Sequence, residues 1–192
     1  MSFRTIKDGQ PITPDSLNRF VGNGAATWVS STSCSGTSTY NIDNSINNSG
    51  LSRWTRVVIS NVVASSATGL FLRAIDSLGN VISTNVYQIG YYGCNAAGAL
   101  DSNWSTATSV WNVGPISNAV ANFNCDFYHL NGGSQGMSMI GMGAGGNAAY
   151  PNLSMYGGWC NYTTRSMRGF QLVSYLGVNF SCKVNVYQYR RG

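Results

Sequence analysis

The chain contains a single histidine, His129, and the nearest acidic residue, Asp126, lies three positions before it. Hydrolysis by a serine nucleophile needs a hydroxyl, an imidazole and a carboxylate that converge on one point. Residues three apart on a strand point to opposite faces, so Asp126 and His129 would not meet if this segment is extended. The sequence favours a structural role for His129 and keeps a small glycan hydrolase or lyase as a distant alternative.

The acidic residues are too few and too scattered to predict another catalytic or metal site. Glycosidases use a pair of carboxylates, and clustered carboxylates also bind hard metal ions. All six acids are aspartates without D-x-D spacing, and those other than Asp126 lie on the N-terminal segment, in Ser/Asn-rich loops or at a turn: Asp8, Asp15, Asp43, Asp76 and Asp101. The five cysteines form no C-x-x-C pair, which excludes the usual zinc spacing. We therefore predict no catalytic residues, no metal and no cofactor.

Residues 141–146 match the pattern G-x-G-x-x-G of dinucleotide-binding proteins. That site requires a helix directly after the glycines, whose N-terminus holds the pyrophosphate, and an acidic residue about 20 positions later. The following residues 147–152 are poor helix formers, and no acid follows Asp126. The segment is interpreted as a loop between strands.

Aromatic residues in loop-like segments are the remaining candidates for a binding surface. Amphipathic rings among Asn, Ser and Gly are typical of surfaces that recognise sugars or proteins. The alternative is that these rings cover the ends of the folded domain. The candidate recognition surface consists of Trp104, Trp111, Tyr150, Tyr156 and Trp159.

The composition limits the possible partners. Charged residues make up only 9% of the chain, against roughly 25% in ordinary soluble domains, which suits a permanent assembly or a carbohydrate-facing surface. The net charge of +5 comes from scattered arginines without a basic stripe, so no nucleic acid is predicted. No apolar run reaches the roughly 20 residues of a membrane span. Without a secretory segment after Met1, the cysteines are interpreted as buried thiols made in a reducing compartment.

The elements that would position these residues are strands. Alternating and β-branched runs separated by turn residues, without helices between them, predict an antiparallel β-sandwich of jelly-roll type, which we assign to residues 26–192. Residues 32–50 are expected to form a long surface loop. Strands are predicted at residues 53–62, 70–76, 81–92, 106–112, 119–129, 137–142, 153–161, 168–175 and 180–189, with a weaker one at 27–31.

The last two predicted strands are expected to pair as a terminal hairpin across a glycine-centred bend. In the final strand Cys182, Val184 and Val186 occupy alternate positions, so they should face the core. The opposite face is predicted to contact a neighbouring subunit through Tyr187, Tyr189 and Arg190.

Residues 1–25 are predicted to form an arm with one short helix. Thr13 is a suitable N-cap, Pro14 suits the first helical position, and residues 22–24 end the helix. A helix this short is unstable alone, so its apolar side must dock on its own domain or on a neighbouring protein. The apolar residues of this candidate attachment arm are Ile12, Leu17, Phe20 and Val21.

Four segments of the chain occur in a familiar order, at residues 53–59, 69–73, 86–93 and 169–190. The first is an aromatic-led strand, the third contains Y-Y-G at 91–93, and the last ends in V-Y-x-Y at 186–189. This order resembles the β-sandwich modules of tailed-bacteriophage virion proteins, and residues 7–18 are similar to N-terminal segments of phage fibre-type proteins.

The resemblance implies a non-enzymatic homo-oligomer, with a trimer favoured, on the exterior of a virion made in the host cytoplasm. Other virion proteins would be its partners, held through the N-terminal arm. The expected role is tail- or fibre-associated attachment to a host surface glycan or protein. A capsid decoration protein that clamps neighbouring head subunits is the alternative. The resemblance brings no catalytic residues with it.

Overall fold

The computed structural model describes residues 26–43, 52–94, 100–128, 137–145, 153–162 and 165–190. These residues form strands and one short 3-10 turn, and none of their helical segments is long and apolar enough to cross a membrane. The elements are β1 (Ala26–Thr37), β2 (Thr39–Ile42), β3 (Ser52–Ala64), β4 (Thr68–Asp76), β5 (Tyr87–Cys94), β6 (Leu100–Thr108), β7 (Trp111–Ile116), β8 (Ala121–Tyr128), β9 (Met137–Gly145), β10 (Leu153–Cys160), β11 (Met167–Ser174), η1 (Tyr175–Gly177) and β12 (Phe180–Arg190).

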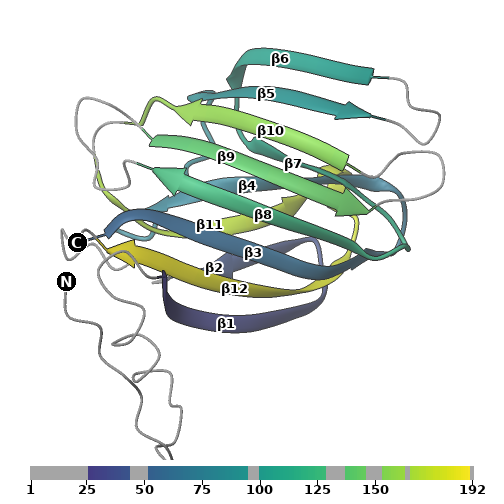
Figure 1. Ribbon diagram of the computed structural model, residues 1–192, viewed down its shortest axis with the longest axis horizontal. Helices are drawn as coiled ribbons and strands as arrows, with labels where there is room; N and C mark the ends of the chain where they lie inside the picture. Colours follow the sequence, from purple (N-terminus) through teal and green to yellow (C-terminus); the bar gives the residue numbers. More distant parts are fainter. Residues whose placement is uncertain are drawn as a thin grey trace, which may run out of the picture.

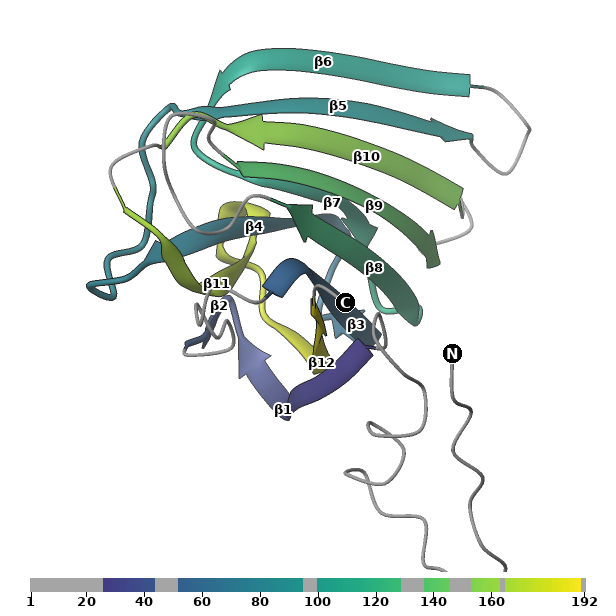
Figure 2. The ribbon, with the colours of Figure 1, turned by 60° about the vertical axis from the view of Figure 1, so that its left-hand side comes forward.

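The strands form two antiparallel sheets packed face to face (Figure 1). The large sheet has the order β1-β12-β3-β8-β9-β10-β5-β6, and the small sheet has the order β2-β11-β4-β7. The large sheet curls around the small one, from β1 at one edge to β6 at the other (Figure 2). The predicted all-β sandwich is therefore confirmed.

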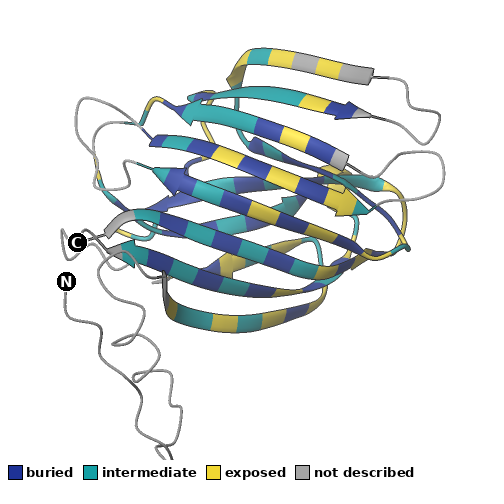
Figure 3. Ribbon diagram, viewed as in Figure 1, coloured by how far each residue is buried: buried dark blue, intermediate teal, exposed yellow. Residues whose placement is uncertain are grey.

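Alternation along the strands sorts the side chains between the core and the surface. In β8, the apolar residues at alternate positions are buried and the residues between them are exposed or half-buried. The same stripes run along the neighbouring strands of the large sheet (Figure 3). A period of two residues is what places one face of a strand against the core.

A chain of aromatic rings joins the two sheets in the core. Trp111 packs edge-on against Tyr87, with ring centroids 4.8 Å apart, and lies 5.4 Å from Phe127. Phe127 in turn lies 4.1 Å from Phe170 of the small sheet. The Tyr87 hydroxyl donates a 2.8 Å hydrogen bond to the carbonyl of Ile82, so its polar end is satisfied inside the core.

The predicted terminal hairpin is wrong. The inward face of β12 is as expected, since Cys182, Val184 and Val186 are all buried. However, β12 pairs with β1 and β3 in the large sheet, whereas β11 pairs with β2 and β4 in the small sheet. The glycine-containing turn η1 therefore carries the chain from one sheet to the other.

Two further predictions of the local structure are also wrong. Residues 32–42 do not form a loop, because β1 continues to Thr37 and β2 follows it. The strand expected at 106–112 is the end of β6 and the start of β7, which belong to different sheets. Ser, Thr and Asn occur both in exposed strands and in loops, so these residue types alone do not distinguish the two.

The arm and its residues Ile12, Leu17, Phe20 and Val21 lie outside the described residues.

Candidate functional site: a groove on the outer face of the large sheet

The outer face of the large sheet carries a shallow groove of ≈ 470 Å³. It crosses β9, β10, β5 and β6, and none of its lining residues is charged. The lining residues are Gly90, Tyr91, Tyr92, Ser102, Trp104, Ile140, Gly141, Met155, Tyr156 and Gly157.

The sheet register explains why the surface is hollow at this point. Ile140 pairs with Gly157, Gly157 pairs with Gly90, and Gly90 pairs with Trp104. Directly opposed residues on neighbouring strands share a face, so two glycines lie side by side between two large side chains. Because Gly157 has no side chain, the backbone there forms the floor of the groove, with Ile140 as one wall and Trp104, which leans over Gly90, as the other.

Trp104 lies over Gly90 and remains largely accessible. A Cβ atom at Gly90 would come within 2.9 Å of Cε3 of Trp104, so the indole occupies the space that a side chain would take. The residue is nevertheless 64% exposed, because it lies on β6, the edge strand of the large sheet. A methyl group at Gly157 would meet only ordinary contacts, the nearest being the Met139 carbonyl oxygen at 3.6 Å, so this part of the floor is open.

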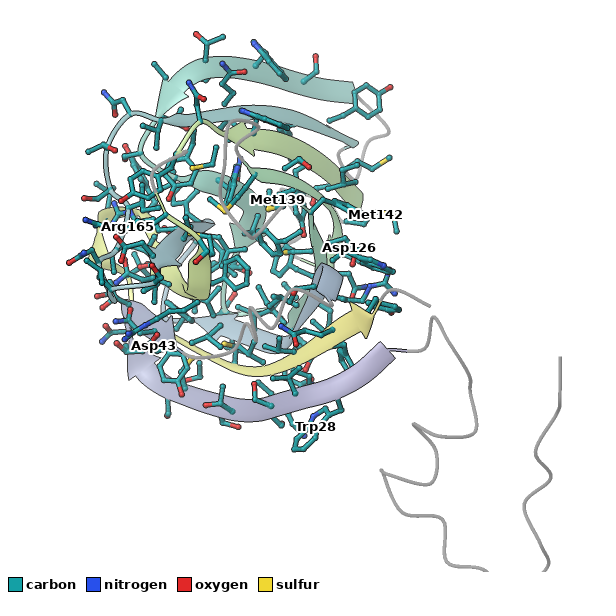
Figure 4. The ribbon with its side chains drawn as sticks, turned by 90° about the vertical axis from the view of Figure 1, so that its left-hand side faces the viewer. Trp28, Asp43, Asp126, Met139, Met142 and Arg165 are labelled. Atoms are coloured by element: carbon teal, nitrogen blue, oxygen red, sulfur yellow. The ribbon has the colours of Figure 1, made fainter. Side chains whose placement is uncertain are left out.

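The neighbouring row of the register adds apolar side chains to the same face. Met142 pairs with Met155, and Met155 pairs with Tyr92, and all three residues are about half exposed. Figure 4 shows Met142 and Asp126 pointing away from the body on the outer side, whereas Met139 points between the sheets. Apolar side chains beside a few hydroxyl groups, here those of Ser102 and Tyr92, are typical of ligand sites.

Tyr156 supports the groove from beneath. Its ring is buried against Gly141, and its hydroxyl donates to the backbone carbonyls of Asn124 and Met142 at 3.2 and 3.1 Å. Burial, together with the neighbouring Cys125 thiol, raises the pKa of this hydroxyl well above its usual range. Tyr156 therefore stays neutral and positions the backbone of β9 beside the groove.

An aromatic and ionic cluster adjoins the groove on the same face. Asp126 pairs in the register with Ile140 on one side and Arg56 on the other, and Arg56 binds both Asp126 oxygens at 2.7 and 2.8 Å. This hydrogen bonding raises the pKa of Arg56 further. The guanidinium also lies 5.1 Å from the ring centroid of Trp54, which stacks on Tyr189 at 3.5 Å.

The structure exposes only part of the predicted recognition surface. Trp104 is exposed and lines the groove, and Trp159 is half-buried on the same face, next to Ser138 and Gln88 in the register. Trp111 and Tyr156 were wrongly placed on an exposed surface, because they are 0% and 3% exposed. Tyr150 lies outside the described residues.

Two residues of the groove, Ile140 and Met155, were not predicted from the sequence. Both lie inside strands, where alternation makes half the positions face solvent. The signal that identifies them is the position of Gly90 and Gly157, which becomes visible only when the strands are placed in register.

The predicted oligomer contact lies on the same outer face. Tyr187 and Tyr189 are half-buried, and Tyr189 is partly covered by Trp54 of its own chain. Arg190 ends β12, and its side chain is outside the described part of the structure. Their contact with a neighbouring subunit stays a prediction.

The structure does not bring a catalytic set together among the described residues. Asp126 is engaged by Arg56, and His129 lies outside the described residues. Residues 132–136 match the pattern G-x-S-x-G of a serine nucleophile, which the sequence-based prediction overlooked, and they also lie outside the described residues. A nucleophile elbow places its serine between a strand and a helix, whereas the strand β9 begins at Met137. Within the described ranges, no group of three or more His, Cys, Asp or Glu residues could hold a metal ion.

The glycine-rich segment 141–146 is mostly a strand and not the expected loop. Residues 141 to 145 continue β9, and Gly141 and Gly143 face inward. A Cβ atom at Gly143 would come within 2.2 Å of Cδ1 of Phe123, so these glycines make room for aromatic rings of the core.

No family model and no curated protein matches the chain. Among solved structures, it is similar to the alginate lyase Aly36B, with 7% identity over 94% of this chain and 93% of that chain and a TM-score of 0.37. A variant of that enzyme in complex with alginate trisaccharide gives 8% identity, the same coverage and a TM-score of 0.36. The SPBc2 prophage-derived protein YomS gives 12% identity over 85% of this chain and 93% of that chain, with a TM-score of 0.24.

No comparison supports the prediction of a virion attachment or capsid decoration protein, and that prediction is withdrawn. Three solved structures that match more than nine-tenths of both chains are of the alginate lyase Aly36B and its variants. At such identities the likeness concerns the fold alone. Any inference about a ligand must therefore come from the residues of the groove. The resemblance to tailed-phage modules, and a trimeric assembly with other virion proteins, stay predictions.

Proposed function

We propose that the protein binds a polysaccharide in the groove between Trp104 and Ile140. The observation that carries the proposal is the exposed indole of Trp104, held over Gly90 beside an open glycine floor. The C–H face of a pyranose ring packs on such an exposed aromatic ring, because both surfaces are apolar and flat. Its hydroxyl groups remain at the edge, where Ser102 and Tyr92 supply hydrogen-bonding partners.

The shape of the groove favours a chain over a small enclosed ligand. The groove is open to solvent along the face of the sheet, and its walls lie on β9 and β6, three strand intervals apart. At the usual strand spacing the backbones of the two walls are about 14 Å apart, and the Trp104 indole covers the part of this span that lies over Gly90. The lining residues supply stacking and hydrogen bonding, so the proposed activity is binding.

The proposal is tested by affinity electrophoresis of the full chain in gels that contain single polysaccharides. Wild-type protein should be retarded by at least one of them. Trp104→Ala should lower the affinity about tenfold or more, as expected when a central aromatic contact is removed.

Trp28→Ala is the matched control. Trp28 is a tryptophan on the same face, 50% exposed, but it lies on β1 at the opposite edge of the sheet. Its removal should leave the retardation unchanged. If no polysaccharide retards the wild type, or if both variants behave like the wild type, the groove is not a glycan site.

A further inference from the structure

The strands that form the groove carry almost no positive charge. From residue 74 to residue 164, which includes all of β5 to β10, the sequence contains neither lysine nor arginine. The acids in this stretch are Asp76, Asp101 and Asp126. The loops that join these strands therefore cannot bring a lysine or arginine to the groove.

The described cations elsewhere are engaged or distant. Arg56, on the same face, is neutralised by Asp126, which lies in the register between Arg56 and the groove wall Ile140. Lys183 lies on β12, on the far side of β3 and β8 from the groove. Arg165 and Arg168 pair with Asp76 and Asp43, and Figure 4 shows Arg165 and Asp43 on the opposite side of the molecule from Met142.

An acidic polysaccharide would bind this surface with lower affinity than a neutral one. A polyuronate carries one carboxylate per sugar, and each carboxylate that loses water against Trp104, Met155 and Ile140 without a cationic partner is penalised. The Arg56–Asp126 pair offers no net positive charge in compensation. A neutral sugar presents C–H faces and hydroxyl groups only, and these match the rings and the hydroxyls of Ser102 and Tyr92.

We infer that the ligand of the groove is a neutral polysaccharide, and this inference rests on the proposed function. The class contains unsubstituted glucans, mannans and xylans, and it excludes polyuronates such as alginate. The specificity follows from the absence of cations on β5 to β10 and from the neutralised Arg56.

The test uses two polysaccharides that share a backbone and differ in charge. Hydroxyethylcellulose and carboxymethylcellulose form the matched pair, and a neutral galactomannan, laminarin, alginate and polygalacturonate extend the panel. Affinity electrophoresis is scored at about 0.3 M salt, where the Debye length is short and the net charge of +5 no longer retains polyanions by itself. Trp104→Ala is run beside the wild type in every gel.

The expected result is that at least one neutral polysaccharide retards the wild type, that retardation is insensitive to further salt, and that Trp104→Ala loses it. Retardation by an acidic polysaccharide equal to or stronger than by any neutral one, and lost in Trp104→Ala, would overturn the neutral specificity while leaving the groove as a glycan site. Absence of retardation by every member of the panel would overturn both.

Discussion

At the scale of single residues, Asp76 anchors the turn that follows β4. Its buried carboxylate accepts hydrogen bonds from the amides of Leu78 and Asn80, the Asn80 side chain, the Tyr162 hydroxyl and Arg165. Burial alone would raise the pKa of this group, but the hydrogen bonds from Asn80, Arg165 and Leu78 outweigh burial and hold the pKa well below its usual range. The ionised form is therefore the one that stabilises the fold.

Replacing Asp76 by Asn should lower the free energy of unfolding by about 3 kcal/mol at pH 7, because the amide has no charge and replaces one acceptor oxygen by an NH2 group that faces the donors Tyr162 and Arg165. A carboxyl group whose pKa is depressed in the folded state is protonated first in the unfolded state, near pH 4. Its stabilisation is complete above about pH 5 and is lost as the pH falls further. Urea unfolding of both proteins from about pH 7 to pH 2 should show that the difference between their free energies of unfolding becomes smaller as the pH falls. A difference that does not change with pH would show that the Asp76 carboxylate does not stabilise the fold.

Two buried cysteines face each other across the edge of the large sheet. Cys34 of β1 and Cys182 of β12 are opposed in the register, with their Sγ atoms 3.1 Å apart. The hydrogen bond from the Cys182 thiol lowers the pKa of Cys34 to about 7, whereas the Cys34 neighbour raises the pKa of Cys182. The thiolate form that attacks disulfides is therefore favoured at Cys34.

Oxidised glutathione should convert this pair into an intramolecular disulfide. The Cys34 thiolate attacks glutathione disulfide and releases one glutathione, and the Cys182 thiolate then displaces the second. Intact mass should fall by two hydrogen atoms, with Cys125 and Cys160 remaining thiols, because burial raises the pKa of both to about 12. Cys34→Ser is the control; Cys34 and Cys182 both remaining as thiols, or a stable glutathione adduct on either of them, would refute the pairing.

Residue types alone could not separate the exposed tryptophan from the buried one. Trp104 and Trp111 both lie in Ser- and Asn-rich sequence, yet their alternate neighbours differ. Ser102 and Thr106 share the face of Trp104, whereas Val113 shares the face of Trp111. Alternation therefore predicts which of the two tryptophans is exposed, but only when the boundary between β6 and β7 is placed correctly.

At the scale of elements, glycines in neighbouring strands have opposite roles. Gly141 of β9 faces inward, and a Cβ atom there would come within 2.1 Å of Cε2 of Tyr156. Gly157 of β10 faces outward over open space. The two positions therefore form a matched pair for substitution by alanine.

Gly141→Ala should lower the free energy of unfolding by about 1–3 kcal/mol, because the added methyl overpacks the core. Gly157→Ala should leave stability unchanged or raise it by about 0.5 kcal/mol, since a strand glycine is entropically costly. Gly157→Ala should nevertheless weaken polysaccharide retardation, because the methyl raises the groove floor. Chemical denaturation and affinity electrophoresis measure the two effects. Equal destabilisation by both substitutions would show that the assigned faces are wrong.

Sequence patterns predicted most strands but not their partners. The alternation in β8 and β12 is strong because one face of each is buried. The pairing of strands depends on contacts between segments far apart in the chain, and the local sequence of a strand does not identify its partner. The segments β11 and β12 are adjacent in sequence and resemble a hairpin, yet each finds its neighbours in a different sheet.

At the scale of the whole molecule, the two sheets fix which face is free to bind. The small sheet covers the inner face of the large one, so ligand contact falls to the outer face. The low charge predicts a carbohydrate-facing surface as one option, and the proposed polysaccharide site agrees with that option. The step from there to a virion attachment protein rested on the order of segments, which the comparisons with solved structures do not support.

Methyl NMR can detect a polysaccharide in the groove directly. Ile140 and Met155 carry methyl groups at the groove, while Met139 carries one on the buried face of β9. Titration with an oligosaccharide of the retained polysaccharide should shift the Ile140 and Met155 methyl resonances and leave that of Met139 almost unchanged. Binding that shifts neither Ile140 nor Met155 would contradict the account.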